Sequence, residues 1–306
     1  MNQVPPLVSI ITPSFNKGPY IEETILSVDN QTYKNIEHII IDGGSTDETI
    51  SILKRYNKDL KWISEPDEGQ SDAINKGWRL AKGDIIAYLN ADDTYLPDAL
   101  ETAVHFFEKN PDIYMVYGDG LITDEYGNNQ RPFHCGEFNL KDLVFCQSYI
   151  FQPSVFLRKE IFDNVGDVDV KLHLAMDHDY WLRTALAYHI GYLPQPLSVA
   201  KIYRDAKSSA LMYNYVIECE YILDNLFANT HIPQEILQYK DEAYNFVYVK
   251  GGLDYIHVKM IKDGTRYLWK AFRMNPGGCI KNTMTLILRY VTRNPIVRCN
   301  VSESLS

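Results

Sequence analysis

The sequence lacks the cysteine patterns of a disulfide scaffold or a zinc cluster. Its five cysteines, at positions 135, 146, 219, 279 and 299, are odd in number, and none belongs to a CxxC pair. Small secreted domains that depend on disulfides usually carry an even and dense set of cysteines. We therefore expect free thiols and a reducing compartment, which indicates a cytoplasmic protein.

Long apolar runs are also missing. No stretch reaches the ~18 residues that indicate a membrane-spanning helix. The first residues, Met-Asn-Gln-Val-Pro-Pro, do not have the basic start and apolar core of a signal peptide. The sequence therefore predicts neither a spanning segment nor a secretion signal.

Positive charge is scarce in most of the chain. Lys and Arg number 30 against 40 Asp and Glu, which gives a formal charge of −10. Domains that bind nucleic acids are usually basic, so nucleic acid is not expected as a partner. The charge is uneven, because the segment from Lys259 to Ser306 has nine Lys or Arg and two acidic residues. The acidic part could hold a divalent cation, and the basic end could meet an anionic surface.

The composition is otherwise that of a globular protein, with 45% hydrophobic and 23% charged residues in a chain of 306. In the first 120 residues, short apolar runs alternate with segments of helical spacing. Strands are expected at 8–12, 37–41, 61–64, 84–89 and 113–117, and helices at 20–30, 46–56, 71–81 and 97–109. This alternation predicts an α/β fold with a mostly parallel sheet.

The pattern changes in the second half of the chain. Residues 121–170 are mixed, and a helix is expected at 178–189. From about residue 209 the strand patterns fade, and helices are expected at 213–227, 233–257, 259–274 and 281–292. We therefore predict an α/β domain of residues 1–208 and a helical C-terminal region of residues 209–306.

Four polar clusters follow predicted strands, and they are Pro13–Asn16, Asp42–Asp47, Glu65–Asp72 and Asn90–Asp93. In open α/β sheets, ligands bind outside the carboxyl ends of the strands. Four clusters at the same edge of one sheet therefore predict a binding site.

The segment Asn90-Ala91-Asp92-Asp93 has two interpretations. It directly follows a strongly apolar strand, and adjacent carboxylates there can bind a hard divalent cation that keeps waters and shares a phosphate ligand. Alternatively, Asp93 or Thr94 caps the helix expected from Pro97. The segment taken alone does not decide between them.

The segment Asp42–Asp47 also has two interpretations. Ser45 or Thr46 can cap the next helix, with Asp47 in its first turn. Asp42 is not needed for that cap, and its carboxylate can accept hydrogen bonds from a nucleobase or a ribose.

The segment Asp177–Arg183 opens a predicted helix. Asp179 and Arg183 have the i,i+4 spacing of an ion pair, and His178 is expected at the surface without a role. Asp177 could be a helix cap or could project into a cleft as a general base.

Taken together, these segments resemble the family 2 glycosyltransferases of the bacterial polysaccharide-biosynthesis type, which have the GT-A fold. The resemblance covers about the first 200 residues. The matching segments, in the family's order, are Val8–Asn16, Ile41–Asp47, Glu65–Gly77, Gly83–Asp93, Gln152–Ser154 and Asp177–Arg183.

The resemblance implies a role for each cluster. The residues expected to contact the nucleotide or its sugar are Pro13, Phe15, Asn16, Asp42, Gln70, Asp72, Asn90 and Asp92. Asn90–Asp93 occupies the place of the family's DxD metal motif, with Asn in the first acidic position. Asp93 is then the expected ligand of Mn²⁺ or Mg²⁺, and Asp92 the expected sugar or ribose contact.

Two further segments match the family with departures. Asp177 matches the catalytic aspartate of the Glu-Asp motif, although Met176 replaces the Glu. The family's Tyr-Arg-x-His segment is represented by Tyr203–Ser208, which has no His. Arg204 and Lys207 are expected to meet the diphosphate.

The implied function is an inverting glycosyltransferase. A nucleotide-diphosphate sugar, with a UDP-sugar favoured, would donate to a saccharide or a lipid-linked saccharide. A divalent cation would stabilise the leaving diphosphate, and Asp177 would take the proton of the acceptor hydroxyl. One alternative is a sugar nucleotidyltransferase, although the chain has no early Gly-rich basic segment for a triphosphate. Another is a noncatalytic nucleotide-sugar-binding subunit of a polysaccharide assembly complex.

The basic C-terminal region leaves two interpretations open. Residues 285–291 are apolar, and Arg289, Arg293 and Arg298 are interspersed or follow closely. The region is either a packed helical appendage or a peripheral contact with anionic lipid at the inner face of the membrane. A homo-oligomer is a further possibility for this region.

Overall fold

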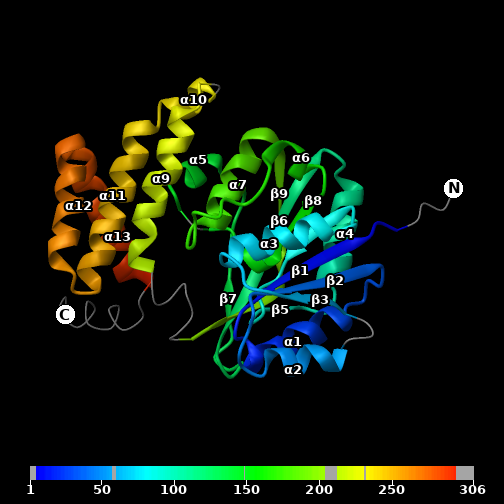
Figure 1. Cartoon of the computed structure of the whole chain (residues 1–306). Helices are drawn as coiled ribbons and strands as arrows, with labels where there is room; N and C mark the ends of the chain where they lie inside the picture. Colours follow the sequence, from blue (N-terminus) through cyan, green and yellow to red (C-terminus); the bar gives the residue numbers. More distant parts are fainter. Residues whose placement is uncertain (1–4, 57–59, 148, 204–211, 231, 294–306) are drawn as a thin grey trace, which may run out of the picture. The chain divides into compact units, whose positions relative to one another are not determined.

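The computed structural model of the chain describes residues 5–56, 60–147, 149–203, 212–230 and 232–293 (Figure 1). The chain divides into two compact units, one of Met1–Leu140 with Ser148–Ser209 and the other of Lys141–Gln147 with Ala210–Ser306. We keep residues 1–208 and 209–306 as a proposal for the two domains. No pattern in the sequence indicated that residues 141–147 group with the second unit.

The first unit is built on one sheet of nine strands. The spatial order is β3-β2-β1-β4-β8-β6-β9-β5, and β7 pairs with β6. The strands are β1 (Val8–Ser14), β2 (Ile36–Asp42), β3 (Lys61–Ser64), β4 (Ile85–Tyr88), β5 (Thr94–Tyr95), β6 (Ile113–Asp124), β7 (Arg131–Phe133), β8 (Val155–Arg158) and β9 (His189–Ile202). The block β3-β2-β1-β4 is parallel, as is the pair β6-β9, and the other pairs are antiparallel. The predicted α/β fold with a mostly parallel sheet is confirmed.

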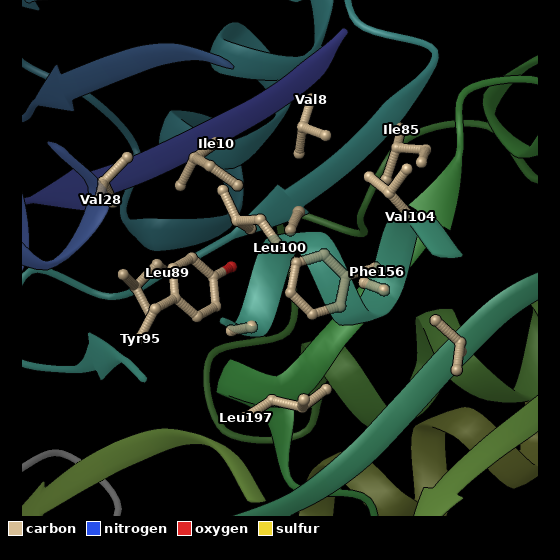
Figure 2. Close-up of a cluster of buried hydrophobic side chains, with 14 of the residues drawn as sticks. Val8, Ile10, Val28, Ile85, Leu89, Tyr95, Leu100, Val104, Phe156 and Leu197 are labelled. Carbon is tan, nitrogen blue, oxygen red and sulfur yellow. The ribbon is translucent and has the colours of Figure 1, made fainter. Parts of the chain in front are cut away.

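Helices pack on both faces of the parallel block. The helical segments of this unit are α1 (Gly18–Asp29), α2 (Thr49–Leu53), η1 (Lys54–Tyr56), α3 (Gln70–Leu80), α4 (Ala99–Lys109), η2 (Gln152–Ser154), α6 (Ile161–Val165) and α7 (Met176–Ala187). Ile10 of β1 joins a buried cluster with Leu100 of α4 (Figure 2). Its neighbour Ile11 lies against Gly77 of α3, where a Cβ would come within 2.4 Å of the Ile11 side chain. Strand β1 is therefore buried on both faces, and its polar residues Ser9 and Thr12 are buried together with its apolar ones.

Several elements differ from the sequence-based expectation. Strand β9 was not expected, because Pro194 and Pro196 interrupt its pattern. Its pairing with β6 shifts register beside Pro196. The helix expected from Pro97 begins at Ala99, and Thr94 and Tyr95 form strand β5 instead of a helix cap. The helix expected over 178–189 is shorter at its end, since α7 stops at Ala187.

The second unit is helical, as predicted. Its elements are α5 (Leu140–Val144), η3 (Met212–Asn214), α9 (Tyr215–Ala228), α10 (Gln234–Leu237), α11 (Lys240–His257), α12 (Ile261–Met274) and α13 (Pro276–Arg293). The single helix expected over 233–257 is two helices. Helix α13 begins five residues before the expected helix, at Pro276, and the Asn275 side chain accepts a hydrogen bond from the Gly278 N–H there at 2.9 Å. In the described part of the chain, no helix has the length and apolar character needed to cross a membrane.

The imidazole of His38, on β2, is buried beside Thr12 of β1, and its burial predicts a pH dependence of stability. Its Nε2 lies 2.9 Å from the Thr12 hydroxyl, and burial lowers the pKa of His38 to about 3. An unfolded histidine titrates near pH 6.5. Below that pH the unfolded chain binds a proton that the folded chain excludes, so unfolding becomes more favourable as the pH falls towards 3.

We expect His38 to lower the free energy of unfolding by about 1.4 kcal/mol for each pH unit below about 6. Urea unfolding of the wild type and of His38→Gln at pH 6.5, 5.5 and 4.5 measures this slope, and the variant should lack that contribution. His105→Gln, at an exposed position, is the matched control and should keep the wild-type slope. Equal slopes for His38→Gln and the wild type would contradict the prediction.

Candidate functional site

The ends of the parallel strands lie level with one another. Ser14 at the end of β1 pairs with Asp42 at the end of β2, and Asp42 pairs with Ser64 at the end of β3. The end of β4 leads directly into Asn90–Asp93. Because these strands run in the same direction, the polar segments that follow them meet at one edge of the sheet.

Asp42 supports the turn that follows β2. Its side chain is fully buried, and its carboxylate accepts hydrogen bonds from the Gly44 N–H at 3.1 Å, the Ser45 N–H at 2.9 Å and the Ser64 hydroxyl at 2.7 Å. Gly44 has a φ of +83°, which favours glycine. The structure thus places Asp42 beneath the site, where it shapes the turn.

The segment after β1 is joined to this turn. Asn16, at a φ of 51°, accepts a hydrogen bond from the Thr46 N–H at 2.9 Å, and its own N–H donates to the Ser45 hydroxyl at 2.7 Å. Pro13 is buried inside β1, opposite Ile41. Phe15 is 58% exposed, so its ring is available for stacking on a planar group such as a nucleobase.

In the cluster Glu65–Asp72, the two residues expected to contact the nucleotide sugar, Gln70 and Asp72, have different partners. Gln70, the first residue of α3, donates from its amide to the Asn90 side-chain oxygen at 2.7 Å. Asp72 accepts the Glu68 N–H at 3.2 Å and forms an ion pair with Lys76 at 3.2 Å. Gln70 is therefore joined to the segment after β4, whereas Asp72 is engaged by its own helix and the turn before it.

A polar network surrounds Asn90. Its amide nitrogen donates to the Asp93 carboxylate at 3.1 Å and to the side-chain oxygen of Gln152 at 3.0 Å. Gln152 in turn donates to the carbonyl oxygen of Tyr88 at 2.9 Å. No role was expected for Gln152, although its position in the matching segment Gln152–Ser154 was an available indication.

Asp93 is the buried member of the pair of carboxylates. Burial and the neighbouring Asp92 charge raise the pKa of Asp93 well above its usual value, although a hydrogen bond from the Asn90 amide lowers it. The helix that follows starts at Ala99, with Asp98 at its N-cap. The interpretation of Asp93 or Thr94 as a cap of that helix is therefore wrong, and Asp93 faces the network instead.

Asp92 already has a positive partner. Its carboxylate lies 2.6 Å from the ammonium of Lys17 and also accepts a hydrogen bond from the Tyr203 hydroxyl. Sequence reasoning gave Lys17 no role, although Lys17 is the basic residue of the segment that follows β1. Arg204 and Lys207, the residues predicted to meet the diphosphate, lie outside the described residues.

Asp177 approaches the same edge from α7. It lies in the first turn of that helix, half-buried, and one of its oxygens accepts the His178 N–H at 2.7 Å. Burial raises the pKa of the Tyr88 hydroxyl, and the charges of Asp177 and Asp93 raise it further. Both carboxylates therefore act electrostatically on the Tyr88 hydroxyl, although they are 84 positions apart in the sequence.

Two neighbours of Asp177 have clear structural roles. The expected ion pair of Asp179 with Arg183 is present at 2.8 Å. The expectation that His178 lies at the surface is wrong, since its side chain is 3% exposed. Met176, where the family often has Glu, is buried and accepts a hydrogen bond from the Ser71 hydroxyl at 2.9 Å through its sulfur.

The available donors suit a cation that prefers oxygen ligands. Asp92, Asp93 and Asn90 present carboxylate and amide oxygens, which are ligands of Mg²⁺ and Mn²⁺. Among the described residues, no group of three or more His, Cys, Asp or Glu side chains could hold a metal. Mg²⁺ sites commonly take one or two carboxylates from the protein and their remaining ligands from phosphate and water.

Solved structures have the same fold. The structure of S. aureus TarS 1-349 in complex with UDP-GlcNAc has a TM-score of 0.64 at 15% identity and covers 94% of this chain and 92% of that one. The mannosyltransferase PcManGT from Pyrobaculum calidifontis, in complex with GDP-Man and Mn²⁺, has a TM-score of 0.62 at 17% identity and covers 97% and 83%. At these identities the similarity concerns the fold, and the predicted GT-A fold is confirmed.

Curated proteins with similar sequences are named as glycosyltransferases. An uncharacterized glycosyltransferase of Rickettsia felis is 27% identical over 252 residues, which is 79% of this chain and 41% of the relative. One of Mycobacterium tuberculosis is 32% identical over 184 residues, which is 59% of this chain and 70% of the relative. The chain thus spans about two fifths of the length of the Rickettsia felis protein.

Residues 9–166 match the family described as Glycosyl transferase family 2. This segment is more than half of the chain. It includes the strand ends and the network around Asn90 described above. The chain therefore belongs to glycosyl transferase family 2.

Proposed function

We propose that this protein is an inverting glycosyltransferase that moves a sugar from a nucleotide-diphosphate donor to a saccharide or lipid-linked saccharide. The placement of Asp93 after β4 and of Asp177 in the first turn of α7, whose Met176 contacts Ser71 of α3, carries the proposal. Asp93 supplies a carboxylate that can bind a cation at the leaving group, and Asp177 supplies one that can accept the proton of the acceptor hydroxyl. An arrangement with two such groups is sufficient for a single displacement at the anomeric carbon.

The donor site is formed by the strand-end segments. The exposed ring of Phe15 is suited to stack on the nucleobase, and the turn held by Asp42 and Asn16 forms the floor beneath it. Gln70 and Asn90, already joined by a hydrogen bond, offer amide groups to the sugar hydroxyls. Asp92 is the proposed ribose or sugar contact, and Asp72 stays a predicted sugar contact.

Asp93 is the proposed ligand of Mn²⁺ or Mg²⁺. Such a cation would stabilise the negative charge that develops on the leaving diphosphate. The fit rests on the buried carboxyl of Asp93, whose ionised form is disfavoured by burial and by Asp92. A cation at this point would favour the ionised carboxylate. The Asn90 amide donates a hydrogen bond to the Asp93 carboxylate at 3.1 Å and so orients it.

Asp177 is the proposed general base. A carboxylate within hydrogen-bond reach of an acceptor hydroxyl can remove its proton as the hydroxyl attacks. The bond from the His178 N–H to one oxygen of Asp177 restricts the orientation of the carboxylate. Attack from the side opposite the leaving diphosphate inverts the anomeric carbon and needs no covalent intermediate. The alternative of a noncatalytic nucleotide-sugar-binding subunit predicts no turnover at all.

The donor and the compartment are also proposals. We favour a UDP-sugar donor, and the structures with the same fold contain UDP-GlcNAc in one case and GDP-Man in another. A role in bacterial polysaccharide biosynthesis, at the cytoplasmic side of a membrane, follows from the family resemblance. The exposed apolar residues of α13, among them Ile280, Met284 and Leu288, add a surface that suits peripheral contact with anionic lipid.

Asp93→Asn tests the metal ligand. Because a metal at the leaving group is worth several kcal/mol, we expect donor turnover to fall by more than about 100-fold, and EDTA to abolish wild-type turnover. Turnover of UDP-GlcNAc and GDP-Man is the measurement, with urea unfolding to confirm a folded variant. Asp98→Asn, at the exposed N-cap of α4, is the matched control. Full activity of Asp93→Asn, or wild-type turnover that is unchanged by EDTA, would contradict the role of Asp93 as a metal ligand.

Asp177→Asn tests the general base. The N-cap of α7 is Ala175 and Asp177 lies within the first turn, so the interpretation of Asp177 as the cap of this helix is wrong. Asn has nearly the size of Asp and keeps the oxygen that accepts the His178 N–H. We expect turnover to fall by ~10²–10⁴ with the binding of UDP or GDP unchanged. Asp163→Asn, in the first turn of α6, is the control for a helix-start acid. Near-normal turnover by Asp177→Asn would exclude the base and direct attention to Asp179.

Vesicle binding tests the proposed membrane contact. Each basic residue near an anionic surface contributes ~1 kcal/mol, so the full chain should cosediment with phosphatidylglycerol vesicles at low salt and less so at high salt. Met284→Glu with Leu288→Glu, at side chains that are 67% and 63% exposed, should remove this binding. Ile217→Glu on α9 is the control. Absence of binding by the full chain would show that α13 has another role.

A further inference from the structure

The ammonium of Lys17 is held at the proposed donor site by three neighbours. Its Nζ lies 2.6 Å from an oxygen of Asp92, and it donates to the Tyr203 hydroxyl, which donates to that same oxygen. The ammonium also lies over the ring of Tyr203, 5.2 Å from its centroid, and 6.0 Å from that of Tyr20. The two tyrosine rings stack at 5.1 Å. The mechanism proposed above does not use this charge.

The start of α1 cannot itself supply free amides to an anion. Lys17 is the N-cap of this helix, and its N–H donates to the Thr49 hydroxyl at 3.0 Å. The Gly18 N–H donates to the Asp47 carboxylate at 3.0 Å. The next residue is Pro19, which has no N–H, and the N–H groups of Tyr20 and Ile21 bond to the Lys17 carbonyl. Positive charge at this point therefore comes from the Lys17 ammonium.

Two other described lysines near this edge have glutamate partners. Lys201 pairs with Glu23, and Lys76 pairs with Glu65 as well as Asp72. Lys17 instead pairs with Asp92, a residue of the proposed metal and sugar segment. Its side chain is 28% exposed, so it can reach a ligand without unpacking the core.

We propose that Lys17 is a diphosphate-binding residue of the donor site, held at Asp92 until the donor arrives. This inference rests on the proposed function. A lysine ammonium is a compact charge on a flexible stem, and it forms charge-assisted hydrogen bonds with phosphate oxygens. As Lys17 turns to the diphosphate, Asp92 keeps the Tyr203 hydroxyl as a donor. The Asp92 carboxylate, no longer paired with Lys17, is then available to bind a ribose hydroxyl or the cation.

The contribution of Lys17 is measured with nucleosides and their diphosphates. We expect Lys17→Met to weaken the binding of UDP or GDP by about 10-fold to 100-fold, the range for a charge-assisted hydrogen bond. Binding of uridine or guanosine, which lack the phosphates, should not change. Lys17→Arg should retain most of the diphosphate affinity. Titration calorimetry on the full chain, with and without Mn²⁺, gives all of these values.

Lys61→Met is the matched control. Lys61 forms a comparable ion pair with Glu37 at 2.9 Å, but at the opposite, amino-terminal end of the strands, so its loss should leave all four affinities unchanged. The inference is overturned if Lys17→Met leaves diphosphate binding intact, or weakens nucleoside and diphosphate binding equally while urea unfolding shows a folded variant. A wild-type chain that binds none of the four probes would overturn the proposed function itself, and Lys17 with it.

Discussion

The buried carboxyl of Asp93 is the constraint on which the arrangement of the site depends. A carboxylate out of contact with water needs compensating donors or a cation. The chain provides the Asn90 amide beside it, and the Asn90 side chain is held by Gln70 from α3 and by Gln152 from η2. The backbone of the same residue is fixed too, because the Asp93 carbonyl accepts a hydrogen bond from the Thr24 hydroxyl of α1. Three helical segments are thus tied to one acidic position.

The parallel half of the fold could be predicted from the sequence. Strands β1 and β4 and most of β2 are buried and rich in apolar residues, whereas the edge strand β3 is largely exposed. The polar segment after each strand marks its end. Predicting this edge of the sheet predicts only some of the residues in the hydrogen-bond network around Asn90. Gln152 lies 62 positions from Asn90. No local sequence pattern predicts which distant side chain forms a hydrogen bond with the Asn90 amide. Its presence in a family-like segment was the one available indication.

Other elements could not be predicted because tertiary pairing overrides their local pattern. Strand β9 contains two prolines, and its pairing with the twelve-residue β6, with register shifts beside Pro196, accommodates them. His178 was expected at the surface because it is a polar residue at the start of a helix, yet it is buried. No local sequence pattern marks Lys17, because its partners Asp92 and Tyr203 are distant in the sequence and meet it only in the fold.

The grouping of residues 141–147 with the helical unit bears on how separable the two units are. Phe145 is buried and packs edge-on against the rings of Tyr239 and Phe246, 6.1 and 5.9 Å away. The chain therefore passes from one unit to the other three times, after Leu140, after Gln147 and after Ser209. A single cut near residue 209 would leave the apolar 143–145 segment without its cover. The first unit is consequently not separable by a single cut, and recombination between family members would have to exchange residues 141–147 together with the C-terminal helices.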